Sequence, residues 1–263
     1  MYQQPEWFGI PDGATAIRLS FLSVAIWWAV FSMPILLFVK EPKIHASVGI
    51  ITAIGNGWKQ LFQTVRDIRH LKVVGMFLLA YWLYIDGVDT IIRMAVKYGT
   101  SIGFSASSLI VALLLVQFVA FPATLAYNYF SSKIGIKKAI YTAIFGYAII
   151  TIFGALMSKE WHFYTLAIGI ACFQGGIQAL SRSMYARIIP KEKAAEFYGF
   201  YNMLGKFAAI IGPPLMGYVG LVTENPRIGI LSLILLFVAG AYCLSKVDLD
   251  EGERMAKAYL SKN

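Results

Sequence analysis

Cysteine and histidine are scarce in this chain of 263 residues. The two cysteines, Cys172 and Cys243, lie inside long apolar runs, so neither a disulfide framework nor a zinc site is indicated. The three histidines are scattered, at His45, His70 and His162. No spacing typical of a nucleophile elbow, a phosphate loop or a metal site occurs. The sequence therefore indicates no enzyme, no cofactor and no metal.

Charge is also scarce, because charged residues make up 14% of the chain, against about 25% in a soluble domain. Hydrophobic residues make up 58%, more than a soluble domain of this length could bury. Runs of roughly 20 apolar residues predict an all-α integral membrane protein in the lipid bilayer. We expect seven transmembrane helices, at residues 17–39, 73–96, 106–127, 139–157, 163–186, 197–219 and 227–245.

The net charge of +9 would suggest nucleic acid as a partner if the protein were soluble. Here the connections after the first, third, fifth and seventh predicted helices hold sixteen Lys and Arg residues, and the opposite connections hold four. By the positive-inside rule the first set is cytoplasmic. The N-terminus is then outside and the C-terminus is in the cytoplasm. This distribution accounts for the charge without nucleic acid.

The second predicted helix, residues 73–96, contains three charged residues, Asp86, Asp89 and Arg93. A carboxylate near the middle of a membrane helix costs about 2.5–3.5 kcal/mol on insertion scales. Positions i, i+3 and i+7 share one helix face, so the three groups can point into one interior. Asp89 and Arg93 could form a structural pair. Asp86 has no cation one turn away and is the better candidate for a proton site, so Asp86→Asn should abolish proton-coupled flux.

Two further polar rows occur at four-residue spacing, Gln174-Gln178-Arg182 in the fifth predicted helix and Tyr198-Asn202-Lys206 in the sixth. Counted from the cytoplasmic ends at ~1.5 Å per residue, Gln178 and Lys206 lie at similar depth. The rows predict a polar substrate or ion pathway lined by the second, fifth and sixth helices. Alternatively, Arg182 and Lys206 only contact lipid headgroups or loop carbonyls.

The sixth predicted helix also contains Gly212, Pro213, Pro214 and Gly217. Two consecutive prolines remove two backbone donors and kink a helix. Membrane proteins tolerate such breaks where neighbouring helices or cavity water satisfy the freed groups. These four residues are candidates for a kink or a gate.

One long connection, residues 40–72, separates the first predicted helix from the second. Gly55-Asn56-Gly57 is expected to break the chain there. Apolar residues then recur at helical spacing from Trp58 to Leu71, which predicts an amphipathic helix on the inner membrane surface. A linker helix packed on loops is the alternative. We therefore divide the chain into residues 1–39, an extracytoplasmic tail and one helix; 40–72; a six-helix unit, 73–245; and a cytoplasmic tail, 246–263.

This arrangement resembles the C-terminal six-helix half of a major facilitator superfamily transporter, preceded by the last helix of the N-terminal half. Residues 128–138 are similar to that superfamily's inner-loop motif: Gly135, Lys137 and Lys138 fit it, whereas Asn128 and Ser132 replace the usual Gly and Asp. The motif's gating charge contact therefore lacks its Asp. Residues 212–217 are similar to the Gly-Pro antiporter motif, displaced to the other half.

Three segments, residues 19–42, 81–99 and 173–220, resemble the vacuole-effluxer-like branch, also known as autophagy-related permeases. The resemblance runs from about residue 9 to 245 and covers the last seven of the family's twelve spans. It implies a secondary active permease or effluxer of a small solute, with amino-acid efflux in fungal relatives. The intramembrane carboxylates, Asp86 and Asp89, predict that transport is coupled to protons. The location would be the cell or inner membrane of a bacterium, or a vacuolar-type membrane in a fungus.

Half of a twelve-span transporter cannot rock against itself, because alternating access moves one six-helix half against the other. We therefore expect a fragment or a truncated reading frame, or a chain that works with a separately encoded N-terminal half or with a second copy. A fragment is the favoured interpretation.

Two other classes share the topology. Seven spans with the N-terminus outside fit a receptor or a retinal protein, but the last predicted helix has its one lysine, Lys246, just past its end rather than in its middle. A non-transporting membrane scaffold is the third class, and the intramembrane charges weigh against it.

Overall fold

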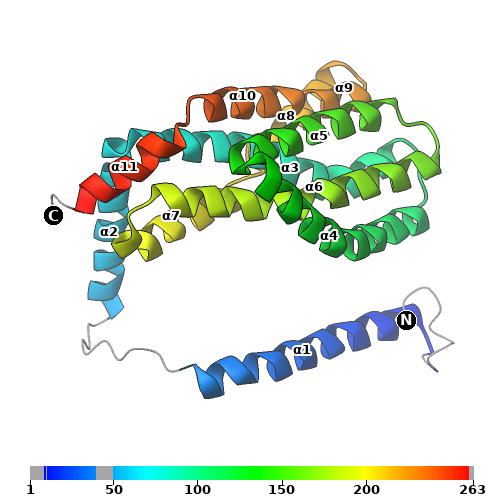
Figure 1. Ribbon diagram of the computed structural model, residues 1–263. Coiled ribbons are helices and arrows are strands. Elements are labelled where there is room, and N and C mark those ends of the chain that lie inside the picture. The colour runs from blue at the N-terminus through cyan, green and yellow to red at the C-terminus, as the bar shows by residue number, and fades with distance from the viewer. Residues whose placement is uncertain (1–8, 10, 40–49, 261–263) are drawn as a thin grey trace. The chain divides into compact units, whose positions relative to one another are not determined.

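The computed structural model describes residues 9, 11–39 and 50–260, and it divides the chain into two units, residues 1–53 and 54–263. Every regular element in these ranges is a helix (Figure 1). In chain order the helices are α1 (Gly13–Phe38), α2 (Ile50–His70), α3 (Lys72–Ser101), α4 (Ala106–Ile134), α5 (Ile136–Leu156), α6 (Glu160–Ile188), the short 3-10 helix η2 (Lys191–Lys193), α7 (Ala194–Lys206), α8 (Gly212–Val222), α9 (Pro226–Leu231), α10 (Ile234–Ser245) and α11 (Leu249–Leu260).

The first unit contains α1, which begins where Asp12 accepts a hydrogen bond of 2.6 Å from the backbone N–H of Thr15. This N-cap satisfies one of the free donors of the first turn and lowers the pKa of the Asp12 carboxyl below its usual value. Almost all side chains of α1 are apolar and exposed, as expected of a helix that faces lipid.

Six segments in the described part of the chain are long and apolar enough to cross a membrane, which confirms the all-α membrane fold. They match six of the seven predicted spans, and the last of them, Pro226–Ser245, consists of α9 and α10. The predicted span 197–219 is not one helix. It is split into α7 and α8 because Pro213 and Pro214 cannot donate in a helix interior and instead occupy the first turn of a new one.

In the second unit α3 lies centrally and packs against α10, α6, α7 and α8 (Figure 1). Its contact with α10 depends on a glycine, because a Cβ added to Gly240 would lie 2.9 Å from the backbone nitrogen of Tyr84. Small residues of this kind let membrane helices approach closely. The core around them is aromatic, with Phe77, Tyr84, Tyr147 and Phe237 almost fully buried.

The amphipathic segment of the central connection is α2, but the expected break at Gly55-Asn56-Gly57 is wrong, because the helix runs through these residues. A glycine costs a helix only about 1 kcal/mol relative to alanine, which a 21-residue helix can tolerate. Residues 40–49 of the connection, which include the basic Lys40 and Lys43, lie outside the described residues.

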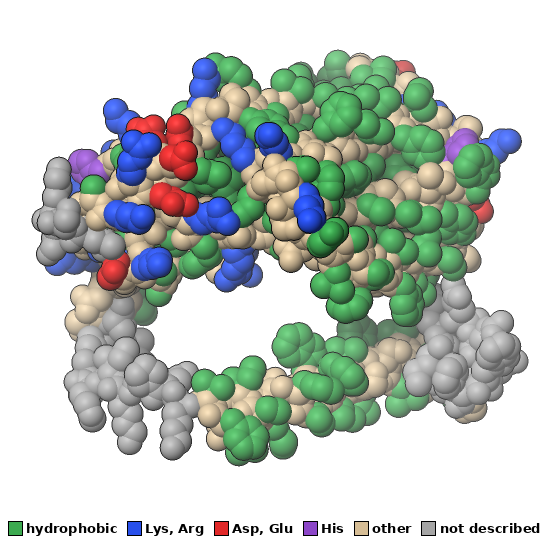
Figure 2. All heavy atoms as spheres, viewed as in Figure 1, with side chains coloured by type: hydrophobic (Ala, Val, Ile, Leu, Met, Phe, Trp, Pro, Cys, Tyr) green, Lys and Arg blue, Asp and Glu red, His purple; other side chains and the backbone are tan. Residues whose placement is uncertain are grey.

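Lys and Arg side chains gather at the end of the bundle where α2 and α11 lie (Figure 2). The turn between α4 and α5 is at this end, where Gly135 has a φ of 89° that favours glycine. Lys137, two residues later, donates from Nζ to the carbonyls of Ser245 and Val247, at 3.3 and 2.6 Å. Two residues of the inner-loop motif therefore form a turn and tie α5 to the end of α10.

We predict that Gly240→Ala lowers the free energy of unfolding by about 1–3 kcal/mol, because the methyl group would overlap the backbone of α3. The matched control is Gly199→Ala on α7, where an added Cβ meets nothing within 4 Å. The control should be neutral or slightly stabilising, since alanine favours a helix. Thermal unfolding in detergent measures both, and equal midpoints for the two variants would contradict the close contact.

Candidate functional site

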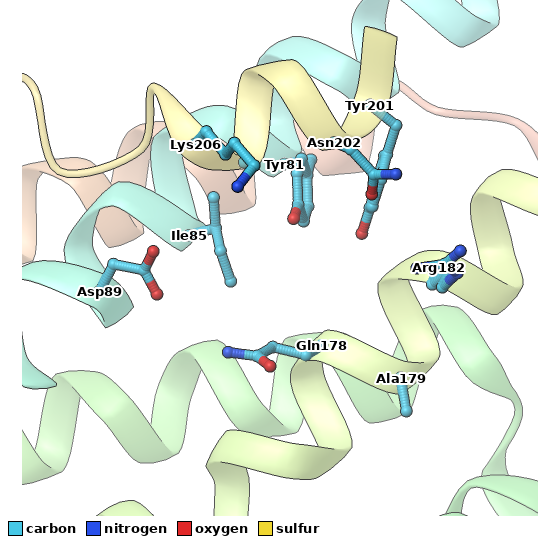
Figure 3. Close-up of a pocket in the computed structure, with 10 residues that line it drawn as sticks. Tyr81, Ile85, Asp89, Gln178, Ala179, Arg182, Tyr201, Asn202 and Lys206 are labelled. Atoms are coloured by element: carbon cyan, nitrogen blue, oxygen red, sulfur yellow. The ribbon is translucent and has the colours of Figure 1, made fainter. Parts of the chain in front are cut away.

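An open cavity of about 540 Å³ lies between α3, α6 and α7 (Figure 3). It is lined by Tyr81, Ile85, Asp89, Gln178, Ala179, Arg182, Tyr201, Asn202, Gly205 and Lys206. Five of the eight residues predicted for the pathway are therefore brought together, namely Asp89, Gln178, Arg182, Asn202 and Lys206. The elements also agree with the prediction, because α3, α6 and α7 belong to the second, fifth and sixth predicted spans.

The cavity holds one acidic and two basic side chains. Asp89 of α3 and Lys206 of α7 project into the same opening, with Gln178 of α6 across from them (Figure 3). Arg182 lies at the other end of the cavity, and its guanidinium carbon is 4.9 Å from the ring centroid of Tyr198. Opposite charges thus face one space, which suits a solute that carries both signs.

One wall of the cavity is a stack of tyrosine rings. Tyr81 of α3 lies on Tyr201 of α7 with ring centroids 4.3 Å apart, and Tyr201 lies on Tyr185 of α6 at 4.9 Å. We did not predict these rings to be part of the site. The spacing offered a signal, because Tyr81, Ile85 and Asp89 follow one another at four-residue intervals on one face of α3.

Asp86 does not line the cavity. Its side chain is completely buried against the start of α8, where Oδ2 accepts from the backbone N–H of Ile211 at 2.9 Å and Oδ1 from that of Gly212 at 2.8 Å. Thr90, one turn along α3, donates to Oδ1 at 3.3 Å. With two of its three donors at the start of α8, this carboxylate caps the N-terminus of that helix from the neighbouring α3.

Capping by Asp86 explains which residues occur where α8 begins. The first turn of a helix has backbone donors without partners, and Pro213 and Pro214 remove two of them. Asp86 accepts from the two that remain, at Ile211 and Gly212. Gly212 has to be a glycine, since a Cβ there would overlap Thr90 Oγ1 and lie 2.7 Å from Asp86 Oδ1.

The other side of the break is also held by α3. Trp82, one turn before Asp86, donates from its indole N–H to the carbonyl of Phe207, just after α7, at 3.3 Å. Ala209 in between has a φ of 68°, a left-handed conformation that is uncommon for alanine. Of the predicted kink residues, Gly212, Pro213 and Pro214 stand at the break, whereas Gly217 lies within α8 with open space beside it.

The remaining two predicted residues are placed elsewhere. The Arg93 side chain is 63% exposed outside the cavity, and its distance of 4.0 Å from the Asp89 carboxylate makes a weak pair. Gln174 lines a separate, mostly apolar cavity of about 40 Å³ between α3, α4 and α6. In the residues described, no three His, Cys, Asp or Glu side chains are grouped so that they could hold a metal ion.

These features define a helical integral membrane protein with a polar, solute-sized cavity between one broken and two unbroken spans. The chain belongs to the vacuole effluxer Atg22-like family, whose sequence profile matches residues 4–257. This confirms the family resemblance of residues 19–42, 81–99 and 173–220.

Two curated relatives illustrate the family. The chain is 39% identical over 241 residues to the uncharacterized MFS-type transporter YxiO of Bacillus subtilis, across 89% of this chain and 54% of that protein. It is 25% identical over 279 residues to autophagy-related protein 22 of Yarrowia lipolytica, across 94% of this chain and 47% of that protein. The chain spans about half the length of the curated relatives it matches. No solved structure matches it.

We predict that Asp86→Ala destabilises the protein by about 1–3 kcal/mol, because the buried backbone N–H of Gly212 and the partly buried one of Ile211 lose their acceptor. Hydrogen exchange should accelerate at the Ile211 and Gly212 amides. Asp89→Ala, one turn along the same helix, is the matched control, because Asp89 accepts no hydrogen bond from a backbone N–H of the described residues. If both variants unfold at the same temperature and exchange alike, Asp86 does not cap α8.

Proposed function

We propose that this chain forms the C-terminal part of a secondary active transporter that exports or imports a small solute. The observation that carries the proposal is the open cavity within membrane-length helices, where Asp89 and Lys206 face the same space. Charged side chains within membrane helices are energetically costly, so they are rare except in charge pairs and in substrate or ion pathways. The family's description as vacuole effluxers and the name of the Bacillus relative as an MFS-type transporter support the same class.

The substrate that suits this cavity best is an amino acid. Its ammonium group can pair with the Asp89 carboxylate, and its carboxylate can pair with Lys206 or Arg182. The rings of Tyr81 and Tyr201, with Ile85, offer an apolar surface for the side chain. Gln178 and Asn202 add neutral donors and acceptors that can orient the polar end.

Proton coupling is assigned to Asp89 rather than to Asp86. Asp86 is fully buried and already accepts from three donors, so it has no route to a proton from the cavity. The Asp89 side chain is 20% exposed and lies beside the substrate space. A carboxylate in that position can exchange a proton whenever the cavity opens to water, and its charge can be balanced by substrate.

The basic end of the bundle is assigned to the cytoplasm, which leaves the N-terminus outside. The membrane would be the cell or inner membrane in a bacterium, or a vacuolar-type membrane in a fungus. Because the fold moves one six-helix half against another, the second wall of the pathway comes from an N-terminal half or from a second copy of this chain.

In proteoliposomes that hold this chain together with the second wall of the pathway, we expect Lys206→Gln to reduce uptake of labelled amino acids by about tenfold, the equivalent of 1.4 kcal/mol of lost substrate pairing. Asp89→Asn should remove the response of uptake to an imposed pH gradient. Lys97→Gln is the matched control on α3 and should leave both unchanged, because its side chain is exposed and does not line the cavity.

Binding is measured separately, as the rise in the thermal unfolding midpoint of the detergent-solubilised chain with each amino acid. A wild-type protein that is neither stabilised by any amino acid nor able to take one up would refute the assignment of substrate. Normal uptake by the Lys206→Gln variant would refute the site.

A further inference from the structure

The exposed side of α2 does not line the cavity and has no part in the proposed transport. Ile54, Trp58 and Phe62 follow one another at four-residue spacing and therefore form one face, the apolar face of α2. Their side chains are 58%, 59% and 68% exposed. The rings of Trp58 and Phe62 lie 6.3 Å apart, so the face is continuous. An exposed apolar surface of this kind marks a site of contact with a membrane or with another protein.

The other side of α2 is docked on the bundle. Thr64, Asp67 and Ile68 are buried, and the Asp67 carboxylate accepts from Lys193 Nζ at 2.9 Å. Lys193 also donates to the hydroxyl of Tyr259 on α11 at 3.1 Å. The hydrogen bond with Asp67 has the largest effect on the pKa of the Lys193 ammonium, followed by the one with Tyr259. Both raise this pKa above its usual value, so the group stays charged. The direction of the apolar face is therefore set by contacts within the second unit.

This docking places α2 crosswise to the spanning helices, at the basic end of the bundle (Figures 1 and 2). A helix that lies across the end of a transmembrane bundle runs along the membrane surface rather than through it. Its apolar face is flanked by three exposed cations, Lys59, Arg66 and Arg69. The single acidic residue of α2 is Asp67, and it is paired with Lys193.

We propose that α2 lies in the membrane interface, with Ile54, Trp58 and Phe62 among the lipid chains and with Lys59, Arg66 and Arg69 on anionic headgroups. Three observations favour lipid over a protein partner. The helix already lies crosswise at the end of the spans, its cations complement an anionic leaflet, and tryptophan is enriched at this depth of a bilayer. The proposal does not depend on transport, and its test needs no substrate.

The test places a nitroxide spin label at position 62 or at position 63 of the full chain, in the background of Cys172→Ala and Cys243→Ala. Phe62→Cys reports on the apolar face. Gln63→Cys, the next residue, is turned by about 100° toward the polar side and is the matched control. Both proteins are reconstituted in nanodiscs of phosphatidylcholine, alone or with one-third phosphatidylglycerol. Collision of the label with oxygen, which is enriched in lipid, is compared with collision with a water-soluble nickel chelate.

We expect the label at position 62 to collide mainly with oxygen and the label at position 63 mainly with nickel. Phosphatidylglycerol should lower nickel access at position 62 by about twofold or more. Replacing Lys59, Arg66 and Arg69 with glutamine should remove this lipid dependence. The same change at Lys133, Lys246 and Lys257 alters net charge equally and should leave it in place.

Equal nickel access at the two positions would overturn the proposal, because the apolar face would then lie in water. A label at position 62 that is immobilised and protected from both reagents would also overturn it, because protein rather than lipid would cover the face. If phosphatidylglycerol does not change nickel access at position 62, the three cations do not bind anionic headgroups, and that part of the proposal is overturned.

Discussion

The joint between α7 and α8 is the constraint on which the site depends. A break inside a membrane span leaves backbone donors and acceptors that no water in the bilayer can satisfy, and each would cost several kcal/mol. Two side chains of α3 supply the partners: Trp82 donates to the carbonyl of Phe207, just after α7, and Asp86 accepts from the amides of Ile211 and Gly212, where α8 begins. Because α7 carries Asn202 and Lys206, the same joint sets their position relative to Asp89 on α3.

Asp86 and Asp89 show how a small rotation separates two roles. Three residues along an α-helix correspond to about 300°, so the two carboxylates point about 60° apart. One direction meets the amides of α8 and is completely buried, and the other opens into the polar cavity. The surroundings also differ, since Asp86 accepts three hydrogen bonds, whereas the Asp89 carboxylate lines the cavity and lies 4.0 Å from Arg93. A carboxylate that lines a polar cavity within membrane helices is a candidate functional group, which is why the proposed function rests on Asp89.

The basic end of the bundle joins parts of the chain that are far apart in sequence. Lys193 stands directly before α7 and connects Asp67 of α2 with Tyr259 of α11. The helix α2, which we propose to lie at the lipid surface, is thereby linked through one side chain to the helix that carries Asn202 and Lys206.

The amino-acid sequence by itself determined the membrane fold, the approximate ends of the spans and much of the cavity. Span length follows from bilayer thickness, and the similar depth expected for Gln178 and Lys206 follows from counting residues along helices. Tertiary structure alone decided the role of Asp86, because its partners are 125 and 126 residues away. It also decided that Gln174 and Arg93 lie outside the cavity and that Tyr81 and Tyr201 line it. Helical spacing tells which residues share a face, but only the packing of neighbouring helices determines what that face meets.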